Sequence, residues 1–218
     1  MGNEYDEKKQ EIFDDLSDMS EIAEEMLQNS FKALENQDGD MAWDVIKRDD
    51  VMDNFEVTIE DKVSRLLTIK NPIASEARLA MALVKMANDL ERIGDHSTNI
   101  AEIALELRNE EYLEPLVMIP ELYEVVFDML DAVLEAFVTK SPDLAEAACR
   151  KDERADNIYD RIYKESLQII DDSTQDEGDI NQALRFVTVA KSLERVGDHA
   201  TNIGEKTVYV LTGNRIKY

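Results

Sequence analysis

The chain has 218 residues, with 49 Asp and Glu against 24 Lys and Arg, and a formal net charge of −25 at pH 7. This charge argues against nucleic acid as a partner, because phosphate contacts need Lys and Arg. It favours cations or basic protein surfaces as partners. The alternative is that the acidic residues only form a solvated surface. The single Cys149 cannot form an internal disulfide, and neither a secretory leader nor an apolar run of about 18 residues is visible, so we expect a cytoplasmic protein without a membrane span.

The hydrophobic periodicity is helical almost throughout, and Pro and Gly occur mainly at expected turns. We expect the second helix to begin at Asp40, a good N-cap residue, and the third to restart after Asn71-Pro72. The six predicted helices cover about residues 5–36, 40–69, 73–108, 120–139, 142–170 and 177–211. Since their connections are short, consecutive helices should be antiparallel neighbours. The sequence therefore predicts an all-α fold of two tandem three-helix bundles, with domains at residues 1–112 and 113–218.

The two halves carry the same polar motif 103 residues apart. Residues 90–102 read LERIGDHSTNIAE and residues 193–205 read LERVGDHATNIGE. The same offset relates Asp49 to Asp152 and Asp53 to Asp156. A long internal period indicates a duplicated unit, and because most matched residues are polar, we interpret it as a duplicated site.

The acidic residues of the motif recur every four positions and so share a helix face. Counting back from the turn near residue 71, Asp49 and Asp53 should stand level with residues 93 and 89, across from Glu91 and Asp95. The second half repeats this arrangement around a turn near residue 174. The candidate metal ligands, including an Asn one turn further along each motif, are Asp49, Asp53, Glu91, Asp95, Asn99, Asp152, Asp156, Glu194, Asp198 and Asn202.

Four carboxylates at one height repel each other, and a divalent or trivalent cation is the simplest remedy. Oxygen ligands suit Mg, Ca, Mn or ferric iron, and Zn is less typical without His or Cys. The competing interpretation is a row of solvent-facing acids that pair with neighbouring arginines, namely Arg48, Arg92, Arg150 and Arg195. His96 and His199 point away from the acidic line, so partner contact or outer hydrogen bonding suits them better than metal ligation. Gly94 and Gly197 inside helices suggest close approach by a neighbour.

These residues closely resemble the PhoU family, regulators of phosphate uptake and of the phosphate-starvation response. The resemblance rests on Glu91-Arg-Ile-Gly-Asp95-His96 and its twin from Glu194 to His199, together with the two shorter acidic pairs, and it covers essentially the whole chain. It implies two three-helix bundles with multinuclear metal clusters, iron first and Mg, Mn, Ca or Zn as alternatives. It also implies negative regulation by contact with the phosphate ABC transporter and its sensor kinase at the inner face of the membrane.

The acidic surface favours docking onto membrane proteins rather than onto anionic lipid, and a homodimer is an open option. A carboxylate-bridged di-iron enzyme is a poor fit, because such sites need a His three residues after Glu, whereas His96 follows Glu91 by five. No nucleophile–base pair or phosphate-cradling Gly loop is visible, so we expect no enzymatic activity. The remaining alternative is an acidic helical scaffold that binds a basic protein partner without a functional metal site.

Overall fold

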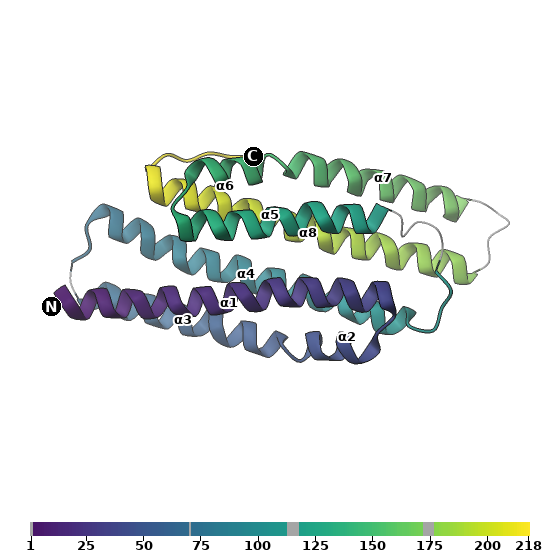
Figure 1. Cartoon of the computed structure of the whole chain (residues 1–218), viewed down its shortest axis with the longest axis horizontal. Helices are drawn as coiled ribbons and strands as arrows, with labels where there is room; N and C mark the ends of the chain where they lie inside the picture. Colours follow the sequence, from purple (N-terminus) through teal and green to yellow (C-terminus); the bar gives the residue numbers. More distant parts are fainter. Residues whose placement is uncertain (1, 70, 113–117, 172–176) are drawn as a thin grey trace.

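The chain folds into an elongated stack of long helices, which the computed structural model describes for residues 2–69, 71–112, 118–171 and 177–218 (Figure 1). The helices are α1 (Gly2–Asn36), α2 (Gly39–Ile46), α3 (Asp49–Ile69), α4 (Ala74–Leu107), α5 (Met118–Thr139), α6 (Pro142–Cys149), α7 (Asp152–Asp171) and α8 (Glu177–Thr212). No strand occurs in these ranges. The predicted all-α architecture of two related halves, α1–α4 and α5–α8, is therefore confirmed. The predicted domain boundary at residues 112/113 meets the segment 113–117, which lies outside the described residues.

Two of the six predicted helices are wrong in one respect, because each is interrupted at the same place in its repeat. The backbone N–H of Arg48 turns back to Val45, and the Arg48 carbonyl then caps the start of α3 by accepting from Val51 and Met52. The Lys151 backbone makes the equivalent bonds between α6 and α7. Neither break contains Gly or Pro, so no turn signal marked it in the sequence.

The break places Asp49 and Asp152 at the first positions of α3 and α7, not in the middle of a helix. The α2 start also differs from expectation, since its N-cap is Asp38, whose side chain accepts from the N–H groups of Asp40 and Met41. An N-cap of this kind stabilises a helix by about 1 kcal/mol. The sequence thus located the helix start within two residues but chose the wrong capping side chain.

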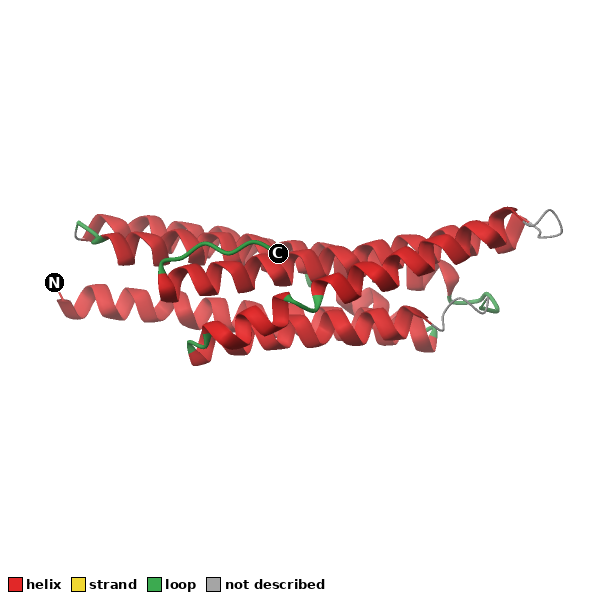
Figure 2. Cartoon of the chain, turned by 90° about the horizontal axis from the view of Figure 1, so that it is seen from above, coloured by secondary structure: helices red, strands yellow, loops and turns green. Residues whose placement is uncertain are grey.

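The apolar faces of both repeats merge into one continuous core. α4 packs against α1 and α3 of its own repeat and against α8 of the other, so α4 and α8 lie side by side along the junction (Figure 1). Figure 2 shows the described residues as long helices joined by loops. Leu90, Ile93 and Leu193 are fully buried there, and each such side chain stabilises the fold by about 1.5–3 kcal/mol. None of the helices in the described ranges has the length and apolarity that a membrane span requires.

The motif glycines lie in this packed region but differ in how closely they are approached. A Cβ at Gly94 would come within 3.0 Å of the Met52 side chain, so the predicted close approach is confirmed in the first repeat. A Cβ at Gly197 would lie 3.6 Å from Val126, which is ordinary packing. Gly197 is therefore not required for space in the second repeat.

Candidate functional site

The first acidic site forms where the start of α3 meets the middle of α4. The Thr98 hydroxyl donates to Oδ1 of Asp49 at 3.1 Å. Burial raises the pKa of Asp49, and the nearby charges of Asp95 and Asp53 raise it further, against the lowering effect of the Thr98 bond. The helix pair therefore brings Asp49, Asp53 and Asp95 into one electrostatic group.

Glu91 is the most constrained member of this group. The residue is only 7% exposed, and burial followed by the charge of Asp95 raises its pKa to about 7. Arg92 lies 3.3 Å from Oε2 of Glu91, but the geometry is not that of a hydrogen bond, and this buried oxygen has no hydrogen-bond partner among the described residues. A buried carboxylate oxygen left without a partner costs about 1–3 kcal/mol.

A further carboxylate, Glu56 of α3, adds negative charge beside Glu91 and contributes to its raised pKa. Asn88, one turn before Glu91 on α4, donates its amide to Oε1 of Glu56 at 2.8 Å. The neutral Asn88 thus holds Glu56 without cancelling its charge. Sequence analysis missed Glu56, because it stands outside the duplicated motif.

The second acidic site repeats the first in outline. The Thr201 hydroxyl donates to Oδ1 of Asp152 at 3.1 Å, which matches the contact in the first repeat. Burial raises the pKa of Asp152 and of Asp156, and Asp198 raises both further. Asp156 and Asp198 therefore act on Asp152 as Asp53 and Asp95 act on Asp49.

The second site differs from the first at two positions of the repeat. Lys191 stands where the first repeat has Asn88, and its ammonium contacts Oε2 of Glu194 at 2.7 Å. Tyr159 replaces Glu56, and Lys191 lies 5.0 Å from the centre of its ring. The second site therefore contains one extra cation and one fewer carboxylate than the first.

The helix register places the predicted ligands close to where spacing put them, with one shift. Asp49 contacts Thr98 instead of standing level with residue 93, because its side chain leans back from the start of α3, toward the later residues of the antiparallel α4. The two asparagines diverge from their expected place. Asn99 is exposed, and the Asn202 amide lies 3.4 Å from Oδ1 of Asp89, at the repeat junction.

Arginines neutralise part of each acidic site. Arg92 contacts Asp95 at 2.7 Å as well as Glu91, and Arg195 contacts Asp198 at 2.9 Å and Glu194 at 3.7 Å. These two pairs are those that the competing interpretation, a row of acids paired with arginines, expects. The other two pair elsewhere, Arg48 with Glu25 and Arg150 with Glu146.

The residues present suit a hard cation in their chemistry. All the charged candidates are carboxylates, the ligand type that such ions prefer, and Glu91 presents a buried oxygen with no hydrogen-bond partner in the described part of the chain. Yet in those same ranges no three His, Cys, Asp or Glu side chains converge closely enough to hold a metal ion. Metal binding would therefore require the carboxylates to turn toward a common centre, away from Arg92 or Arg195.

Comparison with known proteins identifies the family. A family model described as the PhoU domain matches the chain twice, over residues 16–104 and 119–207. The chain belongs to the PhoU family. Each match spans one repeat and includes one complete acidic site, so the duplicated motif is part of the family domain and not an insertion within it.

Relatives and solved structures match the PhoU-family chain over nearly its whole length. A phosphate-specific transport system accessory protein PhoU homologue of Clostridium acetobutylicum is 35% identical, covering 97% of this chain and 96% of its own. A homologue of Thermotoga maritima is 33% identical, with 93% and 87% covered. The crystal structure of PhoU from Pseudomonas aeruginosa superposes with a TM-score of 0.92 at 28% identity, covering 96% of this chain and all of that one. The phosphate transport system regulatory protein PhoU from Streptococcus pneumoniae gives 0.89 at 26%, with 98% and 100% covered.

A polar network at the junction of the two PhoU domains was not predicted. Asp89 of α4, 5% exposed, accepts from Lys206 of α8 and lies 3.0 Å from Nδ1 of His199. His199 and His96 face each other with ring centres 5.7 Å apart, and burial followed by His199 lowers the pKa of His96 to about 4. The histidines therefore belong to the junction between the two domains.

Sequence reasoning missed Asp89 because it has no twin. The equivalent residue is Ser192, buried at 5% exposure, and the equivalent of Lys206 is Ile103, a core residue. A search for duplicated polar residues passes over any residue that occurs once. The usable signal was the difference between the repeats: position 89 is an acid, and the equivalent position 192 is a serine.

Proposed function

We propose that this protein is a metal-binding regulator of phosphate uptake and of the phosphate-starvation response. It acts without catalysis, in the cytoplasm, by contact with the phosphate ABC transporter and its sensor kinase. The proposal rests on membership of a family whose relatives are named phosphate-specific transport system accessory proteins. The match over nearly the full length of those relatives supports the same role for this chain.

The observation that carries the metal part is the presence of the acidic site twice, each copy with carboxylates from two helices. The first would use Asp49, Asp53, Glu91 and Asp95, with Glu56 at its edge. The second would use Asp152, Asp156, Glu194 and Asp198. A bound cation would neutralise the mutual repulsion of these groups and offer open coordination positions to a partner's carboxylate or to phosphate. Of the candidate ions, iron is our first choice, with Mg, Mn, Ca and Zn as alternatives.

Total metal analysis of the purified protein tests this part. The double substitution Glu91→Ala with Asp95→Ala should lower bound metal by about half, and adding Glu194→Ala with Asp198→Ala should bring it close to zero. The matched control is Glu60→Ala with Glu153→Ala, which removes two exposed acids outside the candidate ligand set. Unchanged metal content in the quadruple variant would show that the acidic sites are not metal sites.

One observation favours the alternative of an acidic scaffold that binds a basic partner without metal. The arginines already pair with the key acids, and no three potential ligands converge within the described ranges. The metal analysis separates the two functions, since a scaffold would purify without stoichiometric metal and lose none on substitution.

Deletion of the gene in the source organism tests the regulatory role. In rich phosphate the deletion should raise phosphate uptake and phosphate-starvation gene expression, and the wild-type gene should restore both. Wild-type levels of both in a strain without a second family member would refute the regulatory assignment. The quadruple acidic variant then tells whether regulation depends on the metal.

A further inference from the structure

A cavity of about 530 Å³ lies between the first turns of α4, the last turns of α8 and the chain segment after α8. We call it the basic pocket. Its charged lining residues are Arg78, Lys85, Lys206, Arg215, Lys217 and one acid, Glu205. Arg78 stands about 20 Å from Glu91 along the α4 axis, at about 1.5 Å per residue. The basic pocket is therefore separate from the first acidic site.

Five cations in one cavity are exceptional in a chain with a net charge of −25. Most of them are not neutralised by any carboxylate of the described residues. Arg78, Lys85 and Lys217 make no ion pair with any carboxylate in the described part of the chain, and Arg215 lies 5.0 Å from the centre of the Tyr209 ring. The one acid, Glu205, accepts a bond from the backbone N–H of Tyr218 at 2.9 Å. A concave site that gathers unpaired cations concentrates anions.

Arg78 gives an independent indication of a missing partner. Its Nε is buried and has no hydrogen-bond partner among the described residues. A buried donor is normally satisfied, and arginine is the side chain best shaped for two-point contact with a phosphate group. The unused donor of Arg78 therefore points to an anionic ligand with several oxygen atoms.

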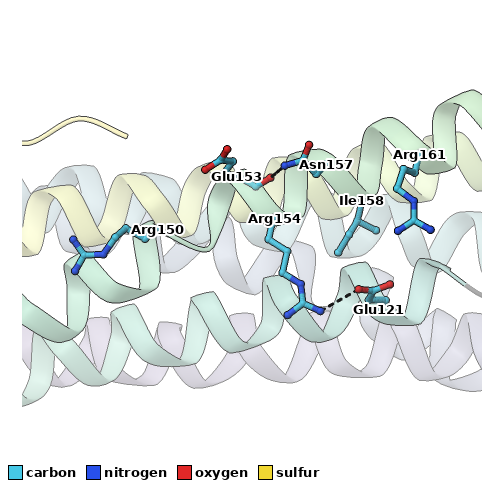
Figure 3. A pocket seen from close by; sticks show the side chains of 7 residues that line it. All are labelled: Glu121, Arg150, Glu153, Arg154, Asn157, Ile158 and Arg161. Carbon is cyan, nitrogen blue, oxygen red and sulfur yellow. Dashed lines mark hydrogen bonds and ion pairs between the residues drawn. The ribbon is translucent and has the colours of Figure 1, made fainter.

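A second cleft of about 400 Å³ shows what a neutralised arginine cluster looks like. It lies on the outer face of α5 and α7 and is lined by Arg150, Arg154 and Arg161 together with Glu121 and Glu153 (Figure 3). There Arg154 contacts Glu121 at 3.0 Å, drawn as a dashed line in Figure 3, and Arg150 contacts Glu146 at 3.5 Å. This cleft has internal partners for two of its three arginines, whereas in the basic pocket only Lys206, of the five cations, pairs with a carboxylate of the described residues.

The rest of the basic pocket is apolar. Met81 is 63% exposed, and Ala82, Tyr209 and Ile216 complete the wall. Cavities of about 300–1,000 Å³ hold small organic ligands, so inorganic phosphate would leave most of this one unfilled. An anionic membrane surface is disfavoured, because the net charge of the chain would be repelled by it.

We propose that the basic pocket binds a soluble organic polyphosphate of nucleotide size. The phosphate groups contact Arg78, Lys85 and Lys217, and the organic part covers Met81 and Ile216. Lys206 also lines the pocket and bonds to Asp89 across the repeat junction, so an anion bound here lies one side chain from the junction network.

Isothermal titration of the full chain with ATP, in excess EDTA so that metal at the acidic sites cannot bridge the nucleotide, tests the proposal. ATP should bind at one site per chain, at least tenfold more tightly than AMP or inorganic phosphate. Arg78→Gln with Lys85→Gln should weaken ATP at least tenfold. The control Lys32→Gln with Lys164→Gln removes the same charge from exposed positions elsewhere and should change affinity less than twofold. If the first pair fails to fold, Arg215→Gln with Lys217→Gln replaces it.

Met81→Ser distinguishes the contribution of the apolar wall of the pocket from that of its cations. It should weaken ATP severalfold while leaving inorganic tripolyphosphate unchanged. Three results would overturn the proposal: no ATP binding at millimolar concentration, equal loss of affinity in the control variant, or binding to anionic phosphatidylglycerol vesicles without binding to ATP. Glu91→Ala with Asp95→Ala should leave ATP binding intact, which keeps this test independent of the proposed metal sites.

Discussion

The two acidic sites share their motif carboxylates but differ in the residue that stands one turn before the motif glutamate. In the first repeat this residue is Asn88, which bonds to Glu56 and leaves Oε2 of Glu91 without a hydrogen bond in the described residues. In the second it is Lys191, whose ammonium satisfies Oε2 of Glu194. The copies therefore reach charge balance differently: the second carries its own cation, and the first leaves room for one from outside. Duplication of the acidic residues does not make the two sites equal.

The largest expected difference between the two repeats is in stability, at the junction where Asp89 of the first repeat corresponds to Ser192 of the second. Asp89→Ala should destabilise the fold by about 3 kcal/mol, because it leaves Lys206 partly buried without its carboxylate. Ser192→Ala, the equivalent change in the other repeat, should cost less than about 1 kcal/mol. Urea unfolding of both variants measures the difference, and equal losses would mean that Asp89 does not hold the junction.

Metal removal should destabilise without unfolding, because the core is continuous and apolar. Cation at a hundredfold excess over its dissociation constant stabilises by about 2.7 kcal/mol. Thermal melts with and without EDTA should show this loss, and Glu91→Ala with Asp95→Ala should remove more of the effect than Glu194→Ala with Asp198→Ala. Loss of the helical circular dichroism signal at room temperature in EDTA would show instead that the fold depends on metal.

Exchanging the residue that differs between the repeats should exchange their affinities. Lys191→Asn should tighten metal binding at the second site about tenfold, or about 1.4 kcal/mol, and Asn88→Lys should weaken the first site similarly. Competition with a fluorescent chelator measures both, and Lys164→Asn is the control for the lost charge. If Lys191→Asn left the affinity of the second site unchanged, this lysine would not explain the difference.

The raised pKa of Glu91 predicts the smallest effect, a pH dependence of the metal-free protein. Because its folded pKa of about 7 exceeds its ordinary value, the folded state binds the proton more tightly, and stability should fall as pH rises from about 4.5 to 7. Glu91→Gln should remove this slope and stabilise the metal-free protein at pH 8 by on the order of 1 kcal/mol, after allowance for solvent screening. Unfolding in EDTA at pH 5 and pH 8 checks it; an unchanged slope in the variant would contradict it.

The sequence predicted the fold well because helical periodicity and the repeat offset are patterns that extend over many residues, so no single residue decides them. Helix spacing also brought Arg92 and Arg195 within reach of the motif acids, as the competing interpretation of those acids expected. It missed the helix breaks at Arg48 and Lys151, because neither break contains the Gly or Pro that would mark a turn in the sequence.

The sequence also missed the part of the site that depends on tertiary contacts. Glu56 and Asp89 acquire their roles only when α3 meets α4 and when α4 meets α8. A comparison of the two halves for what they share cannot find them, because neither residue is shared. Both residues stand at positions where the two repeats differ, but only the packing of the helices shows which of these positions lie at the site or at the junction.

The facing pair of His96 and His199 has a geometric consequence. Equivalent residues of two repeats that touch each other must lie beside the axis that relates the repeats, so the two halves meet through the same surface of each, as the subunits of a two-fold symmetric dimer do. In such a dimer of identical chains, every substitution near the axis occurs twice. In a single chain it occurs once, which is what permits Asp89 on one side of the axis and Ser192 on the other.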